Sequence, residues 1–317
     1  MVFLAGIDEA GYGPFVGPFS VGYSLFRVPS LEIDFWQELS NSITRKPIRN
    51  DRRLRVDDSK KVHSGPHGRT RLERSVAAFR ELIHPQQTDF QSWAKCSPAG
   101  PSIWFDRSPW LKELNVPFCP SVSTERVQLD TLTLQKSLQA SGLSLDDFGA
   151  RIVPAGEWNQ WIHKTQNKGE TLFQITMEVV RHLLSRTGHS PLRIELDRHG
   201  GRLHYAPKLQ TALQPQKIVR HGETSGGSTY TLEFPNREVQ IRFSEKADAT
   251  FLPVSLASLA AKQSRERSMD LFNEWWAQAV PELVGTKGYG VDGKRWLAEV
   301  QGQIPSGVPK SILRRNR

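Results

Sequence analysis

The sequence predicts an α/β domain with a central sheet, and two observations lead to that prediction. Short segments with apolar or alternating, strand-like patterns are interleaved with longer segments of helical periodicity. This order is typical of strands and helices that pack in layers. Apolar residues make up 38% of the 317 residues, so the chain can bury a core sufficient for one large domain or two modest ones.

The chain begins with a predicted pair of antiparallel strands. Residues 2–8 form an apolar run that ends in a glycine-rich turn, and large and small side chains alternate after Pro18. The short connection between these two segments favours antiparallel pairing. A helix is predicted over 68–83, with one apolar face formed by Leu72, Val76, Phe79 and Ile83.

The middle of the chain contains an irregular segment between regular elements. Residues 85–120 hold six prolines and three tryptophans, which predicts an insertion that is irregular and yet packed, because so many aromatic rings would not stay in water. Helical spacing returns over 122–140, and a short strand is predicted at 151–154. An amphipathic helix is predicted over 169–186, with Gly188 at its C-cap.

The last third combines strands with one long helix. Alternation over 192–196 predicts a strand that ends at Asp197, and residues 229–243 are typical of a hairpin. A long helix is predicted over 251–279, with Pro253 in its first turn and small side chains that allow close approach to a sheet. The basic tail, about 305–317, is expected to be mobile.

Charge and cysteine content narrow the classes of partner and compartment. The 42 Lys and Arg outnumber the 33 Asp and Glu, which gives a net charge of +9 and favours nucleic acid over an anionic membrane as the partner. Cys96 and Cys119 have no metal-type spacing, so free thiols in a reducing compartment are expected. Because no apolar run reaches about 18 residues, we expect a cytoplasmic protein without a membrane helix.

Three acidic segments fall where an α/β sheet gathers its functional side chains. Asp8 and Glu9 end the first strand, Asp197 ends another, and Asp248 precedes the long helix. If the four converge, their charges must be neutralised, and oxygen ligands suit a pair of Mg²⁺ or Mn²⁺ ions. Two ions about 3.5–4 Å apart can hydrolyse a phosphodiester. The alternatives are a solvated turn at 8–9, a turn aspartate at 197 and a helix cap at 248.

The pairing of Asp8 with Glu9 sets a structural condition. Successive side chains of a strand point to opposite faces, so both can face one pocket only if the strand breaks at Glu9. Gly11 and Gly13 follow closely and favour such a break.

Taken in order, five segments resemble type 2 ribonucleases H, the ribonuclease HII family. They are GIDEAGYGP at 6–14, DSKK at 58–61, IELD at 194–197, KAD at 246–248 with the helix after it, and KGYG at 287–290. The resemblance implies an RNase H-like fold: a mixed, five-stranded central sheet flanked by helices, with a helical C-terminal portion. It also implies a single catalytic domain over 1–317, with insertions at about 85–120 and 202–240.

The resemblance implies the chemistry and the substrate as well. Asp8, Glu9, Asp197 and Asp248 would be the metal ligands of a two-metal endonuclease. It would cleave the RNA strand of RNA/DNA hybrids, or duplex DNA at a single ribonucleotide, and leave 3′-hydroxyl and 5′-phosphate ends. The backbone of Gly11, Tyr12 and Gly13 would read the ribose 2′-hydroxyl, and Tyr289 would pack against the next deoxyribose. Ser59, Lys60 and Lys61 would contact phosphates.

One departure from the family pattern leaves other functions open. The turn is usually Gly-Arg-Gly, and Tyr12 stands in place of the arginine, so one guanidinium that could clamp a phosphate is missing. The alternatives are a nucleic-acid-binding protein on the same scaffold with weak or no catalysis, and a related nuclease with a different substrate. In each case we expect a monomer.

Overall fold

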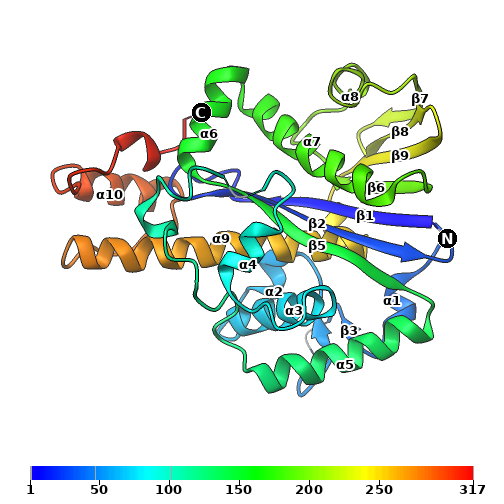
Figure 1. Cartoon of the computed structure of the whole chain (residues 1–317), viewed down its shortest axis with the longest axis horizontal. Coiled ribbons are helices and arrows are strands. Elements are labelled where there is room, and N and C mark those ends of the chain that lie inside the picture. The colour runs from blue at the N-terminus through cyan, green and yellow to red at the C-terminus, as the bar shows by residue number, and fades with distance from the viewer. Residues whose placement is uncertain (1, 47, 101, 317) are drawn as a thin grey trace.

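The computed structural model describes residues 2–46, 48–100 and 102–316, and it has the predicted α/β architecture. A mixed, seven-stranded sheet lies between two sets of helices (Figure 1). The strand order is β5-β2-β1-β6-β9-β8-β7. The strands are β1 Val2–Ala10, β2 Phe19–Val28, β5 Ser144–Val153, β6 Leu192–Asp197, β7 Lys217–Thr224, β8 Gly227–Phe234 and β9 Arg237–Ser244.

The centre of the sheet is parallel and its two sides are antiparallel. Strand β1 pairs antiparallel with β2, as predicted, and parallel with β6, which in turn pairs parallel with β9. Strands β7, β8 and β9 form an antiparallel meander. The expected sheet of five strands is therefore corrected to seven, because the segment at 202–240 contributes β7 and β8 and extends one edge.

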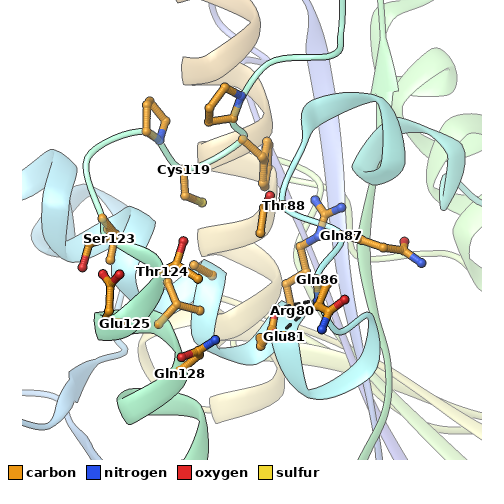
Figure 2. A pocket seen from close by; sticks show the side chains of 16 residues that line it. Arg80, Glu81, Gln86, Gln87, Thr88, Cys119, Ser123, Thr124, Glu125 and Gln128 are labelled. Atoms are coloured by element: carbon orange, nitrogen blue, oxygen red, sulfur yellow. Dashed lines mark hydrogen bonds between the residues drawn. The ribbon is translucent and has the colours of Figure 1, made fainter.

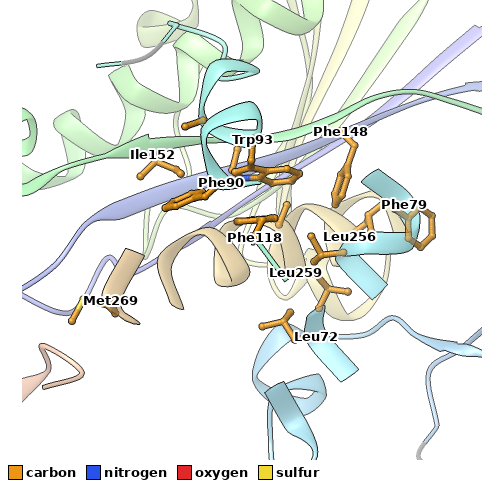
Figure 3. Packing of buried hydrophobic residues seen from close by; sticks show 14 of the residues in the cluster. Leu72, Phe79, Phe90, Trp93, Phe118, Phe148, Ile152, Leu256, Leu259 and Met269 are labelled. Carbon is orange, nitrogen blue, oxygen red and sulfur yellow. The ribbon is translucent and has the colours of Figure 1, made fainter. Parts of the chain in front are cut away.

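One face of the sheet is covered by the long helix α9 (Leu252–Ala279). A Cβ at Gly6 would collide with the backbone of Pro253, and one at Gly22 with the carbonyl of Ala257, so α9 lies directly on β1 and β2. This is the close approach that the small side chains predicted. The core on this face also includes Leu72, Phe79, Trp93, Phe118, Phe148, Leu256 and Leu259 (Figure 3).

Shorter helices complete that layer. Helix α3 spans Gly68–Ile83, as predicted, and packs against α5. The others are α1 Phe35–Glu38, α2 Ser59–Val62, α4 Phe90–Lys95 and α5 Thr124–Ala140, with a small separate pair of strands, β3 Ile43–Thr44 and β4 Leu54–Arg55.

The opposite face of the sheet is covered by α6 (Ala155–Thr165), α7 (Lys168–Thr187) and α8 (Ala206–Leu213). Helix α7 matches the prediction for 169–186, and Gly188 stands at its C-cap, also as predicted. Buried side chains of α7, β1 and β6 form a second core. No helix in the described parts of the chain is long and apolar enough to cross a membrane.

The irregular segment at 85–120 is packed, as its aromatic content predicted. It contains α4 and a 3₁₀ turn, η1 (Pro109–Leu111). Trp93 is buried, stacks on Phe118 at 4.5 Å between ring centroids, and donates a hydrogen bond to the Ser264 hydroxyl of α9 at 2.8 Å. Trp110 is also buried.

The end of the chain returns to the start of the sheet. After α10 (Gly290–Val300) and the 3₁₀ turn η3 (Lys310–Ile312), Ile312, Leu313 and Arg315 are buried. The backbone NH of Arg315 donates to the carbonyl of Phe15 at 2.8 Å. This part of the tail is thus packed against the fold, whereas its composition predicted a mobile extension.

Candidate acidic site at the ends of two parallel strands

The pairing of β1 with β6 brings two predicted carboxylates to one edge of the sheet. Ile7 lies opposite Leu196 in the parallel register, and Asp8 and Asp197 are the next residues of the two strands. Asp248 lies in a 3₁₀ turn, η2 (Ala247–Ala249), immediately before α9. An Asp197 carboxylate oxygen accepts a hydrogen bond from the backbone NH of Ala247 at 2.9 Å, which joins this turn to β6.

Asp8 and Glu9 leave β1 on opposite faces. The strand stays paired as far as Ala10, which lies opposite Ser20, so the break that would turn both carboxylates into one pocket does not occur at Glu9. Asp8 shares its face with Gly6, which lies under α9, and it accepts a hydrogen bond from Ser258 of α9. Glu9 belongs to the face that α7 covers.

The four carboxylates nevertheless influence one another strongly. Burial, followed by the charge of Glu9, raises the pKa of Asp8 well above its usual value. Burial and the charges of Asp197 and Asp248 raise the pKa of Glu9 to about 8. Burial also raises the pKa of Asp197, and burial with the charges of Asp58 and Asp197 raises that of Asp248 to about 6. Such an accumulation of negative charge favours a bound cation or a bound proton.

The Asp-Ser-Lys-Lys segment lies beside this acidic group. Asp58 caps α2 by accepting a hydrogen bond from the backbone NH of Lys60 at 2.8 Å. The hydroxyl of Ser59 is 3.0 Å from that of Ser258, the residue that also bonds Asp8. The ammonium of Lys60 lowers the pKa values of Glu9, Asp197 and Asp248. Lys61 forms an ion pair with Asp57 at 3.4 Å.

The ligand atoms of these carboxylates suit a hard divalent cation, but the side chains are not yet arranged around one point. The candidate ligands are all oxygen donors, and their pKa values are raised first by burial and then by the neighbouring carboxylates, whose charge a cation would neutralise. Within 2–46, 48–100 and 102–316, no three Asp, Glu, His or Cys side chains are close enough together to hold one metal ion. Asp8, Asp197 and Asp248 share one face of the sheet, so holding an ion requires these side chains to turn toward one another.

The glycine turn that follows β1 is held by two buried arginines. Gly11 has φ +84°, a conformation that side chains other than glycine rarely adopt. The guanidinium of Arg315 donates hydrogen bonds to the carbonyls of Gly11 and Pro14, and the side chain of Arg265 lies against Gly11. Tyr289 lies near Gly13, and the guanidinium of Arg265 is 4.9 Å from the centroid of the Tyr289 ring.

Tyr12 is part of an aromatic cluster beside Glu9. Its ring centroid is 6.5 Å from that of Phe19 and 6.3 Å from that of Trp158. The ammonium of Lys168, at the start of α7, is 4.2 Å from the centroid of the Tyr12 ring. A cation therefore lies against the residue that stands in place of the arginine.

Lys168 and Arg315 were not predicted from the sequence, because each contacts the turn from a distant part of the chain. Arg315 is separated from Gly11 by 304 residues. In the sequence, nothing distinguishes Arg315 from the other basic residues of the tail.

A separate cavity lies away from these residues. It has a volume of about 620 Å³ between α3, α5 and the end of the 85–120 segment, and none of the predicted site residues lines it (Figure 2). Its buried Arg80 stacks over the rings of Trp93 and Phe118 at 5.1 and 5.5 Å. This cavity is therefore distinct from the acidic site.

Comparison with known proteins identifies only remote likenesses. No family model and no curated protein matches the chain. Among solved structures, ribonuclease HII of Archaeoglobus fulgidus, from its PCNA complex, is 14% identical with a TM-score of 0.42, covering 99% of this chain and 94% of that one. Ribonuclease H2 of Pyrococcus horikoshii is 18% identical with a TM-score of 0.40, covering 98% and 92%. Bst-RNase HIII, in complex with Mn²⁺, is 9% identical with a TM-score of 0.44, covering 99% and 66%. These values are too low to support a functional argument, which therefore rests on the side chains of the site.

Proposed function

We propose that this protein is a divalent-metal-dependent endoribonuclease of the ribonuclease H type. Its substrate is the RNA strand of an RNA/DNA hybrid, or a single ribonucleotide in duplex DNA, and its products carry 3′-hydroxyl and 5′-phosphate ends. The observation that carries the proposal is the position of Asp8 and Asp197 at the carboxyl ends of two paired parallel strands, with Asp248 in the turn that Asp197 bonds. Lys60 offsets part of the negative charge at Asp197 and Asp248, whose pKa values stay raised.

Each group has a distinct part in this proposal. Asp8, Asp197 and Asp248 would hold Mg²⁺ or Mn²⁺, and Glu9 would complete the set from the other face of β1. When bound, the ions supply an activated water and charge stabilisation for the departing oxygen. Ser258 orients Asp8 through its hydrogen bond, and the NH of Ala247 orients Asp197. Lys60, with Ser59 and Lys61 beside it, positions a phosphate.

The glycine turn selects the sugar in this scheme. Arg315 holds the carbonyls of Gly11 and Pro14 inward, so the backbone that Gly11, Tyr12 and Gly13 present to a ribose is fixed before substrate binds. Tyr289 is 44% exposed, so its ring is available to pack against the adjacent deoxyribose. The protein acts in the cytoplasm as a monomer in this proposal.

The first prediction is that the wild-type protein nicks a duplex containing one ribonucleotide in the presence of Mg²⁺ or Mn²⁺. Asp8→Asn and Asp197→Asn should each lose at least about 100-fold in rate, since even residues that only orient metal ligands contribute 10–100-fold. The measurement is single-turnover cleavage resolved on a denaturing gel, with metal titrated from zero. Asp146→Asn is the matched control, because Asp146 is a partly exposed side chain of β5 that pairs with Arg27 at 2.9 Å.

A second function is favoured by the placement of the carboxylates, since no three of them surround one point in the described chain. If wild type and Asp8→Asn bind the duplex equally and neither cuts, the protein is a nucleic-acid-binding module with this fold. Equal cleavage of an all-DNA duplex would instead identify a related nuclease with a different substrate.

A further inference from the structure

A basic cleft opens beside the acidic site. It lies between the segment 44–57, α2 and the start of α3, and has a volume of about 590 Å³. Seven of the side chains that line it are basic and two are acidic. Of the five segments that resemble ribonucleases H, only Asp-Ser-Lys-Lys contributes to the lining of this cleft, through Lys61.

Part of this charge is neutralised within the cleft. Arg53 pairs with Asp51 at 2.7 Å, and Asp57 is shared by Arg55 at 3.6 Å and Lys61 at 3.4 Å. These contacts fix the shape of the wall, and they leave more cations than anions facing the opening.

Of the remaining arginines, Arg74 pairs with Asp130, whereas Arg71 and Arg45 are held by backbone carbonyls and keep their charge. Arg71 donates from Nε to the carbonyl of Val62 at 3.2 Å and from Nη2 to the carbonyl of Ser64. Arg45 donates to the carbonyl of Ala249 and lies 4.9 Å from the centroid of the Trp36 ring. A carbonyl positions a guanidinium and does not cancel its charge, so both cations are preorganised for an anionic ligand.

Two contacts place the cleft next to the acidic site. Ala249, which Arg45 contacts, is the neighbour of Asp248. Lys61, which lines the cleft, follows Lys60, whose charge acts on three of the carboxylates. A ligand that contacts both Lys60 and Lys61 would therefore reach from the carboxylates to the cleft.

We propose that this cleft binds the phosphodiester backbone of the same nucleic acid whose ribonucleotide lies at Asp8. This proposal rests on the proposed function. A concave, basic channel suits a single polyanionic strand, whereas an anionic membrane presents a flat surface. Arg45, Lys46 and Arg71 contact phosphates away from the scissile bond. They position the duplex and carry no sequence preference.

The experiment measures binding separately from cleavage. In an Asp8→Asn background, fluorescence anisotropy gives the Kd for a ribonucleotide-containing duplex and for an all-DNA duplex over a range of salt concentrations. Combining Arg45→Gln, Lys46→Gln and Arg71→Gln should reduce the slope of log K against log salt by about 1 per cation, for both duplexes alike. The matched control combines Arg27→Gln, Lys217→Gln and Arg295→Gln, which remove equal charge from carboxylate-paired side chains outside the cleft.

Each outcome decides the proposal. A reduced slope in the cleft variant with an unchanged slope in the control supports it. An unchanged slope in the cleft variant, or an equal loss in the control, overturns it. Because Arg45 contacts the turn that carries Asp248, the exposed Lys46→Gln alone provides a check that does not depend on that contact, with an expected loss of about 1 in slope. Failure of the wild type to cut, with the slope still reduced, would refute the nuclease proposal and leave the cleft assignment standing.

Discussion

At the scale of single residues, the ring of Tyr12 packs against its aromatic neighbours. The ring contacts Phe19 and Trp158 and carries the ammonium of Lys168 on its face. Aromatic pairs of this geometry and a cation against a ring each contribute on the order of 0.5–1.5 kcal/mol. An aromatic cluster and a lysine from α7 therefore surround the tyrosine that departs from the Gly-Arg-Gly pattern.

This arrangement predicts that the ring of Tyr12 matters and its hydroxyl does not. Tyr12→Leu should lower the free energy of unfolding by about 1–3 kcal/mol, through the loss of the ring contacts. Tyr12→Phe should change it by less than about 0.5 kcal/mol. Urea denaturation followed by tryptophan fluorescence measures both. A larger loss for Tyr12→Phe than for Tyr12→Leu would show that the hydroxyl has the dominant role.

Residues also show where prediction from sequence ends. Asp8, Asp197 and Asp248 could be assigned to one edge of the sheet, because strand ends and a helix start are local patterns. Glu9 points to the other face of the sheet from Asp8 because β1 stays paired with β2 as far as Ala10. Gly11 and Gly13 had instead favoured a break of the strand at Glu9. Lys168 and Arg315 reach the glycine turn only through tertiary packing, which leaves no periodic signal.

At the scale of elements, α9 organises the site. It packs on β1 and β2 through Gly6 and Gly22, presents Ser258 to Asp8, and places Arg265 against the glycine turn. Its span was predictable from its length and from Pro253. Its direct contact with the sheet was predictable from its small residues. The strand β7 was not predicted, because alternation over 217–224 is interrupted by polar side chains.

Because α9 lies directly on the sheet, adding one methyl group at their contact should lower the free energy of unfolding substantially. Gly22→Ala should lower the free energy of unfolding by about 1–3 kcal/mol, since its Cβ would meet the backbone of Ala257 and neither element can yield easily. Gly222→Ala in β7 is the control, because nothing lies within 4 Å of a Cβ there. That control should be neutral or slightly stabilising. Equal losses in the two variants would argue against tight packing of α9.

At the scale of the whole molecule, the excess of positive charge is unevenly distributed. Four carboxylates crowd the edge of β1 and β6, and seven cations line the neighbouring cleft. The net charge of +9 predicted a polyanionic partner, and composition alone could not locate it. The sheet of seven strands likewise depends on how the 202–240 segment pairs, which its hairpin pattern indicated only in part.

The crowded carboxylates predict a pH dependence of stability in metal-free protein. The pKa of Glu9 is raised from 4.5 to about 8 in the folded state, so between those values the folded protein retains a proton that the unfolded chain releases. Stability in EDTA should therefore fall as pH rises from about 4.5 to about 8. Glu9→Gln should reduce this fall, which thermal unfolding at several pH values measures.

Metal should oppose that loss. At pH 8 a saturating divalent ion that binds only the folded protein should raise its stability by about 2.7 kcal/mol when the ion is at 100 times its Kd. Asp8→Asn should lose most of this gain, while Asp146→Asn should keep it. A wild-type protein whose stability is the same with and without Mg²⁺ or Mn²⁺ would contradict the metal assignment.

The buried contacts of Arg315 have a genetic consequence. A stop codon or frameshift shortly before residue 311 would spare the seven-stranded sheet and all four carboxylates. It would remove the buried Ile312 and Leu313 from one core, and with them the hydrogen bonds of Arg315 to Gly11, Pro14 and Phe15. Under the proposed function, a truncated product that still folds would be defective in distinguishing ribose from deoxyribose.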